Sequence, residues 1–145
     1  MGPSLPAPFR HRARSARLVA FVCGQEAGVS GVKLFKRKDA KFDSMKPAKG
    51  RAGLARMIGP ETAKMMGGGL AEFDGCDIAW TVLYDEFIVV LEGVFKLGVG
   101  DKVVEGHVGD VIWIPENTPI RYMGDKSVVF YALAPVDWKK RHGME

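Results

Sequence analysis

The sequence predicts an all-β fold, an antiparallel barrel or sandwich built from short strands. From about residue 54 to residue 133, short apolar segments alternate with turns made of Gly, Asp and Pro. Such spacing is typical of antiparallel β proteins, and no segment reads as a long helix. With 145 residues, 47% of them hydrophobic, the chain is large enough for one domain with its own core.

That domain is expected to cover residues 32–145, after a leader of residues 1–31. The leader holds four arginines and one glutamate, so it carries a net charge of +3 out of the total of +4. Its composition is typical of a disordered leader, and an Arg-rich organelle-targeting presequence is the alternative. Because the basic charge lies mainly in the leader, it does not indicate nucleic-acid binding by the domain.

Two further compositional features bear on location. No apolar run approaches the ~20 residues of a membrane-spanning helix, so we expect no membrane partner. Cys23 and Cys76 are too few for a disulfide framework and form no CxxC pair. We therefore expect a cytoplasmic protein in which both cysteines are thiols, with Cys76 as a small buried residue.

The first half of the domain is expected to contain three strands. Val32–Lys36, with alternating basic residues, suits an exposed sheet edge, and a loop follows from Arg37 to Arg51. Residues 54–58 form the second strand, and residues 61–66 are either a helical turn or a loop. Residues 70–73 form the third.

The glycine triplet before the third strand, residues 67–69, has two interpretations. Consecutive bare amides can cradle a phosphate. However, no Lys-Ser/Thr pair and no clear helix follow these glycines, which favours a flexible approach to a strand.

Further strands are expected at residues 76–83, 86–92, 94–99, 102–107, 111–114, 120–123 and 127–133. Gly-Asp pairs separate several of them and indicate tight turns. After the last strand, Trp138 is expected to pack back on the barrel. The basic residues that follow it are interpreted as a solvated end.

Two segments carry a family resemblance. Residues 84–93 form an apolar strand that begins with two carboxylates and ends at Gly93, and residues 109–120 combine a Gly-Asp turn, a strand and an Ile-Pro loop. These resemble the two motifs of the cupins, which implies a single-domain RmlC-like jelly roll, or double-stranded β-helix barrel.

Within the cupins, the chain is similar to the C-terminal domain of the ethanolamine-utilisation Q family (EutQ) over residues 50–138. The matching residues are Phe73-Asp74, Trp80 to Glu86, Val90 to Gly93, Gly109 to Val111, Ile114-Pro115, Ala134-Pro135 and Trp138.

The resemblance also bears on metal binding. Metal-dependent cupins use three histidines and a glutamate, and the match places Glu86 at the glutamate and Ile120 at the third histidine. The positions of the first two hold no histidine, and His107 lies on a polar hairpin with an expected surface role. We therefore expect no tightly bound transition metal. A hard ion such as Mg²⁺ would need phosphate oxygens from a ligand.

Strand alternation turns the same region into a candidate pocket. Trp80, Tyr84 and Glu86 share one parity. The resemblance to cupins implies that Glu86 points into the barrel, so Trp80 and Tyr84 should do so too, and Tyr122, which shares the parity of Ile120, should join them from another strand. Glu72 on a preceding strand is expected to form a carboxylate pair with Glu86, which would raise one pKa and create an acid/base site. The candidate catalytic residues are Glu86, Tyr84 and Glu72, and Trp80 and Tyr122 are candidate ligand-binding residues.

Each of these side chains also has a purely structural interpretation. Glu86 can be a buried, hydrogen-bonded structural carboxylate. The tyrosines can be core residues with satisfied hydroxyl groups, and the tryptophans can serve packing alone.

The family resemblance implies an accessory protein of ethanolamine utilisation, associated with a bacterial microcompartment and with acetate kinase activity. Phosphoryl transfer would require ATP, Mg²⁺ and nearby cations, for which Arg56 and Arg121 are the candidates. One alternative is a non-catalytic cupin that binds a small polar molecule or acts as a scaffold, commonly as a homodimer. Another is a metal-independent acid/base enzyme that uses Glu86 and Tyr84.

Overall fold

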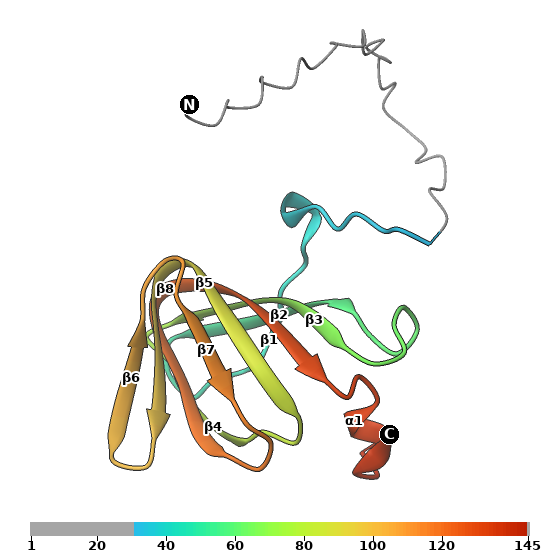
Figure 1. Cartoon of the computed structure of the whole chain (residues 1–145). Helices are drawn as coiled ribbons and strands as arrows, with labels where there is room; N and C mark the ends of the chain where they lie inside the picture. Colours follow the sequence, from blue (N-terminus) through green and yellow to red (C-terminus); the bar gives the residue numbers. More distant parts are fainter. Residues whose placement is uncertain (1–30, 145) are drawn as a thin grey trace, which may run out of the picture. The chain divides into compact units, whose positions relative to one another are not determined.

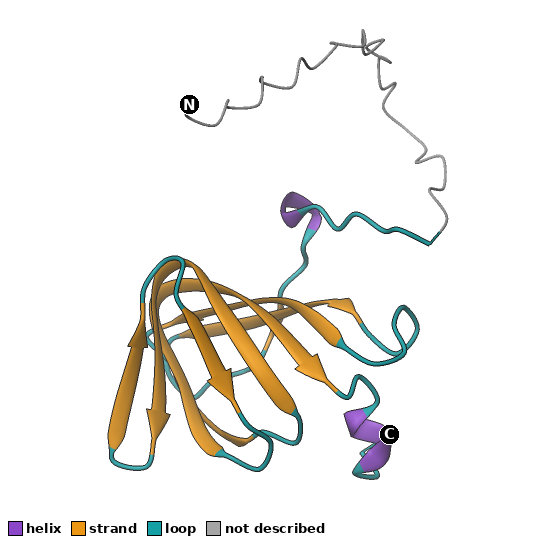
Figure 2. Ribbon diagram, viewed as in Figure 1, coloured by secondary structure: helices purple, strands orange, loops and turns teal. Residues whose placement is uncertain are grey.

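The computed structural model describes residues 31–144, and the barrel belongs to a compact unit of residues 34–145. Strands dominate, as predicted (Figure 2). The elements are η1 (Arg37–Asp39), β1 (Asp43–Ser44), β2 (Arg51–Ile58), β3 (Gly67–Asp74), β4 (Asp77–Thr81), β5 (Asp85–Val99), β6 (Lys102–Gly106), β7 (Val111–Ile114), β8 (Pro119–Ala134) and α1 (Trp138–Arg141). The expected leader, with Cys23, lies outside the described residues apart from Gly31.

Two long antiparallel strands, β5 and β8, organise the sheet (Figure 1). They pair from Asp85↔Ala134 to Gly98↔Arg121. Each is shared between two sets of neighbours: β8 pairs with β3 and β4, and β5 pairs with β6 and β7. All of these pairings are antiparallel, so the strands curl around one interior, as expected for a jelly-roll barrel.

The bend in this long pair lies at Gly93. Its φ of +62° lies in the left-handed region, and a Cβ at this position would collide with the carbonyl oxygens of Asp125 and Lys126 on β8. The ladder shifts register on both sides of Glu92, which is the signature of a bulge. Gly93 therefore lets one continuous strand replace the two expected at residues 86–92 and 94–99.

Three expectations about the fold were wrong. Residues 32–36 form no strand and lead into η1, because no neighbouring strand pairs with them among the described residues. Gly124 and Asp125 do not make a turn, because both stay paired with β5 inside the single strand β8. Residues 67–69 lie within β3 itself, where a Cβ on Gly69 would collide with the carbonyl oxygen of Ala55.

The core fills the interior side of the barrel. Fully buried side chains there include Ile88, Phe95 and Val129. Cys76 is buried as expected, and burial raises the pKa of its thiol. No described helix has the length and apolar character needed to cross a membrane.

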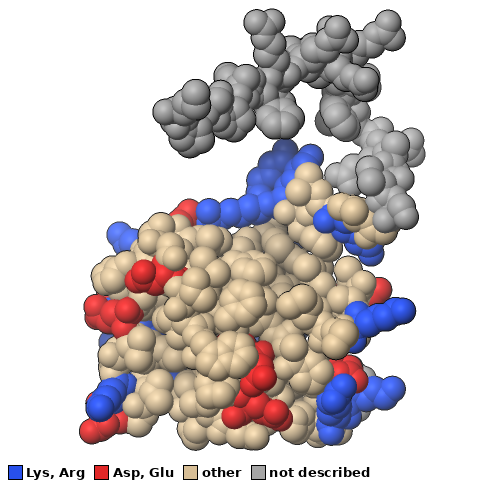
Figure 3. All heavy atoms as spheres, in the orientation of Figure 1, with Lys and Arg blue, Asp and Glu red and all other residues tan. Residues whose placement is uncertain are grey.

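The outer face over β5, β7 and β8 is apolar. Phe87 and Val89 point outward from β5 and pair with Trp113 and Val111 on β7, and Val89 also pairs with Phe130 on β8. Trp113 and Val111 are exposed by 59% and 64%. Figure 3 shows an area over β5 and β7 that lacks Lys, Arg, Asp and Glu, with the charged side chains gathered around its edge.

Candidate functional site

The barrel interior contains a cavity of about 370 Å³. This volume falls in the range of small-molecule sites. Its walls come from β2, β3, β4, β5, β8 and α1. The lining residues are Met45, Leu54, Arg56, Ile58, Gly59, Pro60, Gly67, Gly68, Ala71, Phe73, Ile78, Trp80, Tyr84, Glu86, Ile88, Tyr122, Val129, Tyr131, Leu133, Val136, Trp138 and Lys139.

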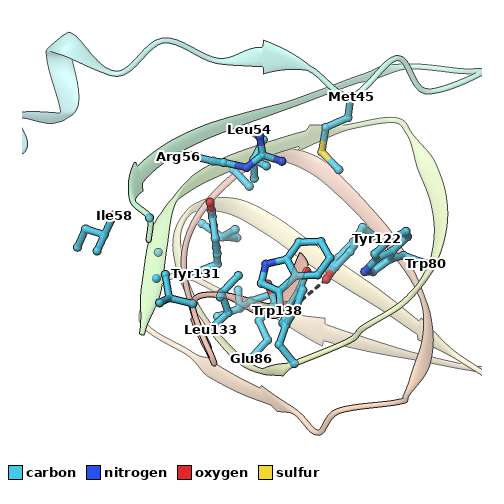
Figure 4. Close-up of a pocket in the computed structure, with 18 of the residues that line it drawn as sticks. Met45, Leu54, Arg56, Ile58, Trp80, Glu86, Tyr122, Tyr131, Leu133 and Trp138 are labelled. Atoms are coloured by element: carbon cyan, nitrogen blue, oxygen red, sulfur yellow. Dashed lines mark hydrogen bonds between the residues drawn. The ribbon is translucent and has the colours of Figure 1, made fainter. Parts of the chain in front are cut away.

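Glu86 is the one carboxylate among these lining residues, and it is 4% exposed. Alternation along β5 turns it inward together with Ile88, as expected. The Tyr122 hydroxyl donates a hydrogen bond of 2.7 Å to Glu86 Oε2 from β8 (Figure 4). Burial raises the pKa of Glu86 to about 7, although the hydrogen bond from Tyr122 opposes that rise. Near neutral pH, Glu86 can therefore donate or accept a proton.

Aromatic rings surround this carboxyl group. The ring centres of Tyr84 and Trp138 lie 4.9 Å apart, and those of Trp80 and Trp138 lie 6.4 Å apart. Trp138 reaches the cavity from the C-terminal helix α1, as its expected packing on the barrel requires. Burial, and then the charge of Glu86, raise the pKa of Tyr84, so its hydroxyl stays protonated across the neutral range.

A second polar group lines another part of the wall. Arg56 projects from β2 toward the cavity, near Tyr131 of β8 (Figure 4). Within residues 31–144, Arg56 makes no ion pair with any carboxylate. Burial raises the pKa of Tyr131 to about 12, although the charge of Arg56 acts in the opposite direction. Lys139 also lines the cavity, and its Nζ lies 5.7 Å from the centre of the Trp138 ring.

The structure separates two predicted site residues from the cavity. Glu72 lies between Ala71 and Phe73, which face the cavity, so its side chain points to the other side of β3. There its Oε1 lies 3.9 Å from Nε of Arg51. The expected pairing of Glu72 with Glu86 was therefore wrong. Arg121 also lies outside, where it binds both oxygens of Asp77 and lowers the pKa of that carboxyl group.

Trp80, Tyr84, Glu86 and Tyr122 line one cavity, in agreement with their predicted inward placement. Arg56, for which the sequence predicted no orientation, lines the same cavity. Sequence reasoning missed Tyr131 and Lys139 as lining residues. Tyr131 has the same parity as Val129 on the last strand, which was a usable signal. Lys139 lies in α1, a helix that the sequence analysis did not predict.

The donor set does not fit a cupin-type metal centre. Among the described residues, no three His, Cys, Asp or Glu side chains converge. Ile120, at the position of the third histidine, is buried with its Cα paired to Trp80. His107 is exposed in the turn between β6 and β7, as expected.

Comparisons with known proteins agree with the fold and the motifs. The chain matches the family model of the ethanolamine utilisation protein EutQ over residues 12–140. It is 29% identical to the acetate kinase EutQ of Salmonella typhimurium over 114 residues, which are 77% of this chain and 50% of that protein. The chain thus spans about half the length of the curated relatives that it matches.

Solved structures give the same result. The crystal structure of an ethanolamine utilization protein Q from Salmonella typhimurium LT2 superimposes with a TM-score of 0.68 at 29% identity, covering 75% of this chain and 90% of that one. An RmlC-like cupin from Shewanella frigidimarina superimposes with a TM-score of 0.54 at 10% identity, covering 70% and 88%, and shows the shared fold alone. The chain has the cupin barrel, and it belongs to the EutQ family of ethanolamine utilisation proteins.

Proposed function

We propose that this chain binds a small acyl compound in its barrel cavity and uses it in acetate kinase-type phosphoryl transfer. The curated relatives carry the name acetate kinase EutQ, so acetate and acetyl phosphate are the first ligands to test. The observation that carries the proposal is that Arg56 and Glu86 lie on the walls of one cavity.

Arg56 supplies the anion-binding group. A guanidinium group offers parallel N–H donors that match carboxylate and phosphate oxygens. Since no described carboxylate pairs with Arg56, a ligand anion need not displace a protein partner. Lys139 provides a second cation among the residues that line the cavity.

Glu86 supplies a hydrogen-bonding group. With a pKa of about 7, it is partly protonated at neutral pH and can donate a hydrogen bond to an acyl oxygen. In the proposed reaction, an acetate oxygen attacks the γ-phosphorus of ATP. The bond from that phosphorus to the β-phosphate oxygen breaks, and acetyl phosphate and ADP form. No proton transfer is needed, so the task of the side chains is positioning and charge neutralisation.

The residues that line the cavity in the described part of the chain do not suit a resident metal ion. One carboxylate and several phenols cannot replace the histidine donors of a transition-metal site. Mg²⁺ in kinases is bound largely through nucleotide phosphate oxygens and water, and it would enter with ATP. We propose that the cavity itself holds no tightly bound transition metal.

A second candidate is a non-catalytic cupin that binds a small polar molecule. The glycine triplet favours this candidate, because residues 67–69 are paired with β8 within β3 and offer no loop that could bind the phosphates of a nucleotide. A metal-independent acid/base enzyme that uses Glu86 and Tyr84 is a third candidate, supported by the raised pKa of Glu86.

The deciding experiment combines thermal shift with product detection. Acetate, acetyl phosphate and ATP are added to the wild type, Arg56→Gln, Glu86→Gln and the matched control Arg51→Gln, which alters another exposed arginine of β2 outside the cavity. Stabilisation by acetate or acetyl phosphate that Arg56→Gln abolishes and Arg51→Gln retains supports the binding site. Acetyl phosphate formation then distinguishes a kinase from a binding protein. Equal responses of both arginine variants would overturn the proposal.

We also propose that the outer apolar face pairs with a second copy of the chain. A face without charges meets no like-charge repulsion when it packs on its own copy across a two-fold axis. The exposed residues of β7, Val111 and Trp113, would be covered in such a pair. Because the chain belongs to a family of ethanolamine utilisation proteins, we propose that the dimer acts in the bacterial cytoplasm, in association with microcompartment proteins.

A further inference from the structure

The cavity has charged or ionisable groups in two separate regions of its wall. Arg56 lies on β2, and Glu86 with Tyr122 lies across the barrel on β5 and β8 (Figure 4). By the strand order, Arg56 and Glu86 are three strands apart, which corresponds to about 14 Å along the curved sheet. Tyr131 lies between these regions on β8, where it pairs with Gly69 of β3 and with Ile88 of β5.

The Glu86 carboxyl group has an oxygen left for a ligand. Tyr122 is its only side-chain or backbone donor among the described residues, and the bond goes to Oε2. No fully buried side-chain oxygen or nitrogen in the described chain lacks a partner. The other oxygen of Glu86 must therefore remain accessible from the cavity, where a donor can reach it.

The surroundings of that oxygen favour a cationic donor. Trp80, Tyr84 and Trp138 line the cavity around Glu86, and aromatic ring faces attract ammonium groups. A buried carboxylate without a cation is costly, and an ammonium group on a ligand would supply the missing charge. At the other end, Arg56 favours a carboxylate or phosphate.

We propose that the ligand is a small zwitterion, an aliphatic primary amine that also carries a carboxylate or phosphate group. Its ammonium group binds Glu86 and the aromatic rings, and its anionic group binds Arg56. The inference deepens the proposed function, since it rests on Arg56 as the anion site and adds a second recognition point. It predicts that an amino-substituted carboxylate or phosphate binds more tightly than the corresponding simple anion.

Matched ligand pairs test this inference by titration calorimetry at pH 8. Propionate is compared with β-alanine, and ethyl phosphate with O-phosphoethanolamine, because the members of each pair differ chiefly by the amino group. We expect the amino ligand of at least one pair to bind roughly tenfold more tightly, which corresponds to about 1.4 kcal/mol. Glu86→Gln should remove that advantage and leave the binding of the simple anion, whereas Arg56→Gln should weaken both ligands.

The pH dependence provides a second readout. The ionisable groups that face Glu86 are Tyr84, Tyr122 and Tyr131, and the pKa of each lies above its ordinary value. Between pH 6 and pH 8, Glu86 is thus the titrating group of this region, and its ionisation should strengthen amine binding as the pH rises. Propionate should not gain affinity over the same range. The melting temperature of each unliganded variant checks that it folds.

The outcomes separate the two proposals. If neither amino ligand binds more tightly than its partner at pH 8, the zwitterion inference is overturned, while binding of propionate or ethyl phosphate through Arg56 leaves the anion site standing. If no ligand of either pair binds, both are overturned. An amine advantage that survives in Glu86→Gln also contradicts the inference.

Discussion

The Tyr122 hydroxyl group donates its hydrogen bond to Glu86 across the barrel interior, from β8 to β5, at 2.7 Å. Both residues are buried, with exposed fractions of 6% and 4%. A carboxyl group with one neutral donor and little water keeps its proton to a higher pH than a solvated one. This pair therefore sets the protonation state of the cavity.

Stability should depend on pH through Glu86. Its pKa is about 7 in the folded protein and 4.5 in the unfolded chain, so the folded state binds the proton more tightly. The resulting contribution is fully present below pH 4.5 and is lost as the pH rises through 7, by on the order of 3 kcal/mol. Urea unfolding gives the free energy of unfolding of the wild type and of Glu86→Gln at each pH. The difference between the two proteins should change by this amount from pH 4.5 to pH 8. A constant difference from pH 4.5 to pH 8 would contradict the assignment.

Tyr122→Phe should move this transition upward. Without its donor, the ionised form of Glu86 loses a hydrogen bond to a charged group, worth about 1.5–3 kcal/mol above pH 8. The pH midpoint of the stability difference should rise. Tyr131→Phe is the control, because its hydroxyl group makes no hydrogen bond to Glu86. The same midpoint in the wild type and Tyr122→Phe would show that the hydrogen bond from Tyr122 does not control the pKa of Glu86.

Trp138→Ala should open the cavity wall. The ring packs against Tyr84 and Trp80, so its loss should cost about 2 kcal/mol of unfolding free energy. Ligand affinity should fall as well. Lys140→Ala, on the same short helix and exposed, should change stability by less than about 0.5 kcal/mol. Denaturant melts compare the two variants, and equal small effects would show that Trp138 does not hold the wall.

Gly93→Ala and Gly100→Ala form a matched test of the bend in β5. Both glycines have φ near +60°, but only at Gly93 would a Cβ meet backbone atoms. Alanine at Gly100 should cost about 1–2 kcal/mol for the left-handed conformation alone. Alanine at Gly93 should cost clearly more, because the β8 backbone must also move. Comparable unfolding free energies for the two variants would argue against a bend fixed by that close approach.

If two copies of the chain pair through the outer apolar face, light scattering should give twice the mass of one chain. Trp113→Glu places a charge in the middle of this face and should yield monomers. Val108→Glu is the control, since Val108 is 65% exposed in the turn between β6 and β7. A wild type that is already monomeric, or a Trp113→Glu dimer, would contradict the proposal.

Period-two alternation was sufficient to predict most of the fold and much of the cavity. Trp80, Glu86 and Tyr122 were placed correctly because each lies on a strand whose alternation fixes its face. Tyr84 lies in the bend between β4 and β5, and it faces the cavity as its parity with Glu86 predicted. The error at Glu72 has the same origin. Glu72 is adjacent to Phe73 on its strand, and because Phe73 faces the core, alternation turns Glu72 to the outer side.

Other features depend on contacts that a linear pattern does not contain. The continuity of β8 through Gly124 and Asp125 depends on pairing with β5, which overrides the local turn signal. Likewise, Arg56 and Arg121 were equivalent candidates in the sequence. Asp77 binds Arg121 on the outside, and this pairing leaves Arg56 as the arginine of the cavity.

The most direct test of the account is calorimetric titration of acetyl phosphate into the wild type and Arg56→Gln at pH 7.5. The account predicts saturable binding at one site per chain in the wild type and at least a tenfold loss of affinity in the variant. Equal affinity in both proteins, or no binding to the wild type, would contradict it.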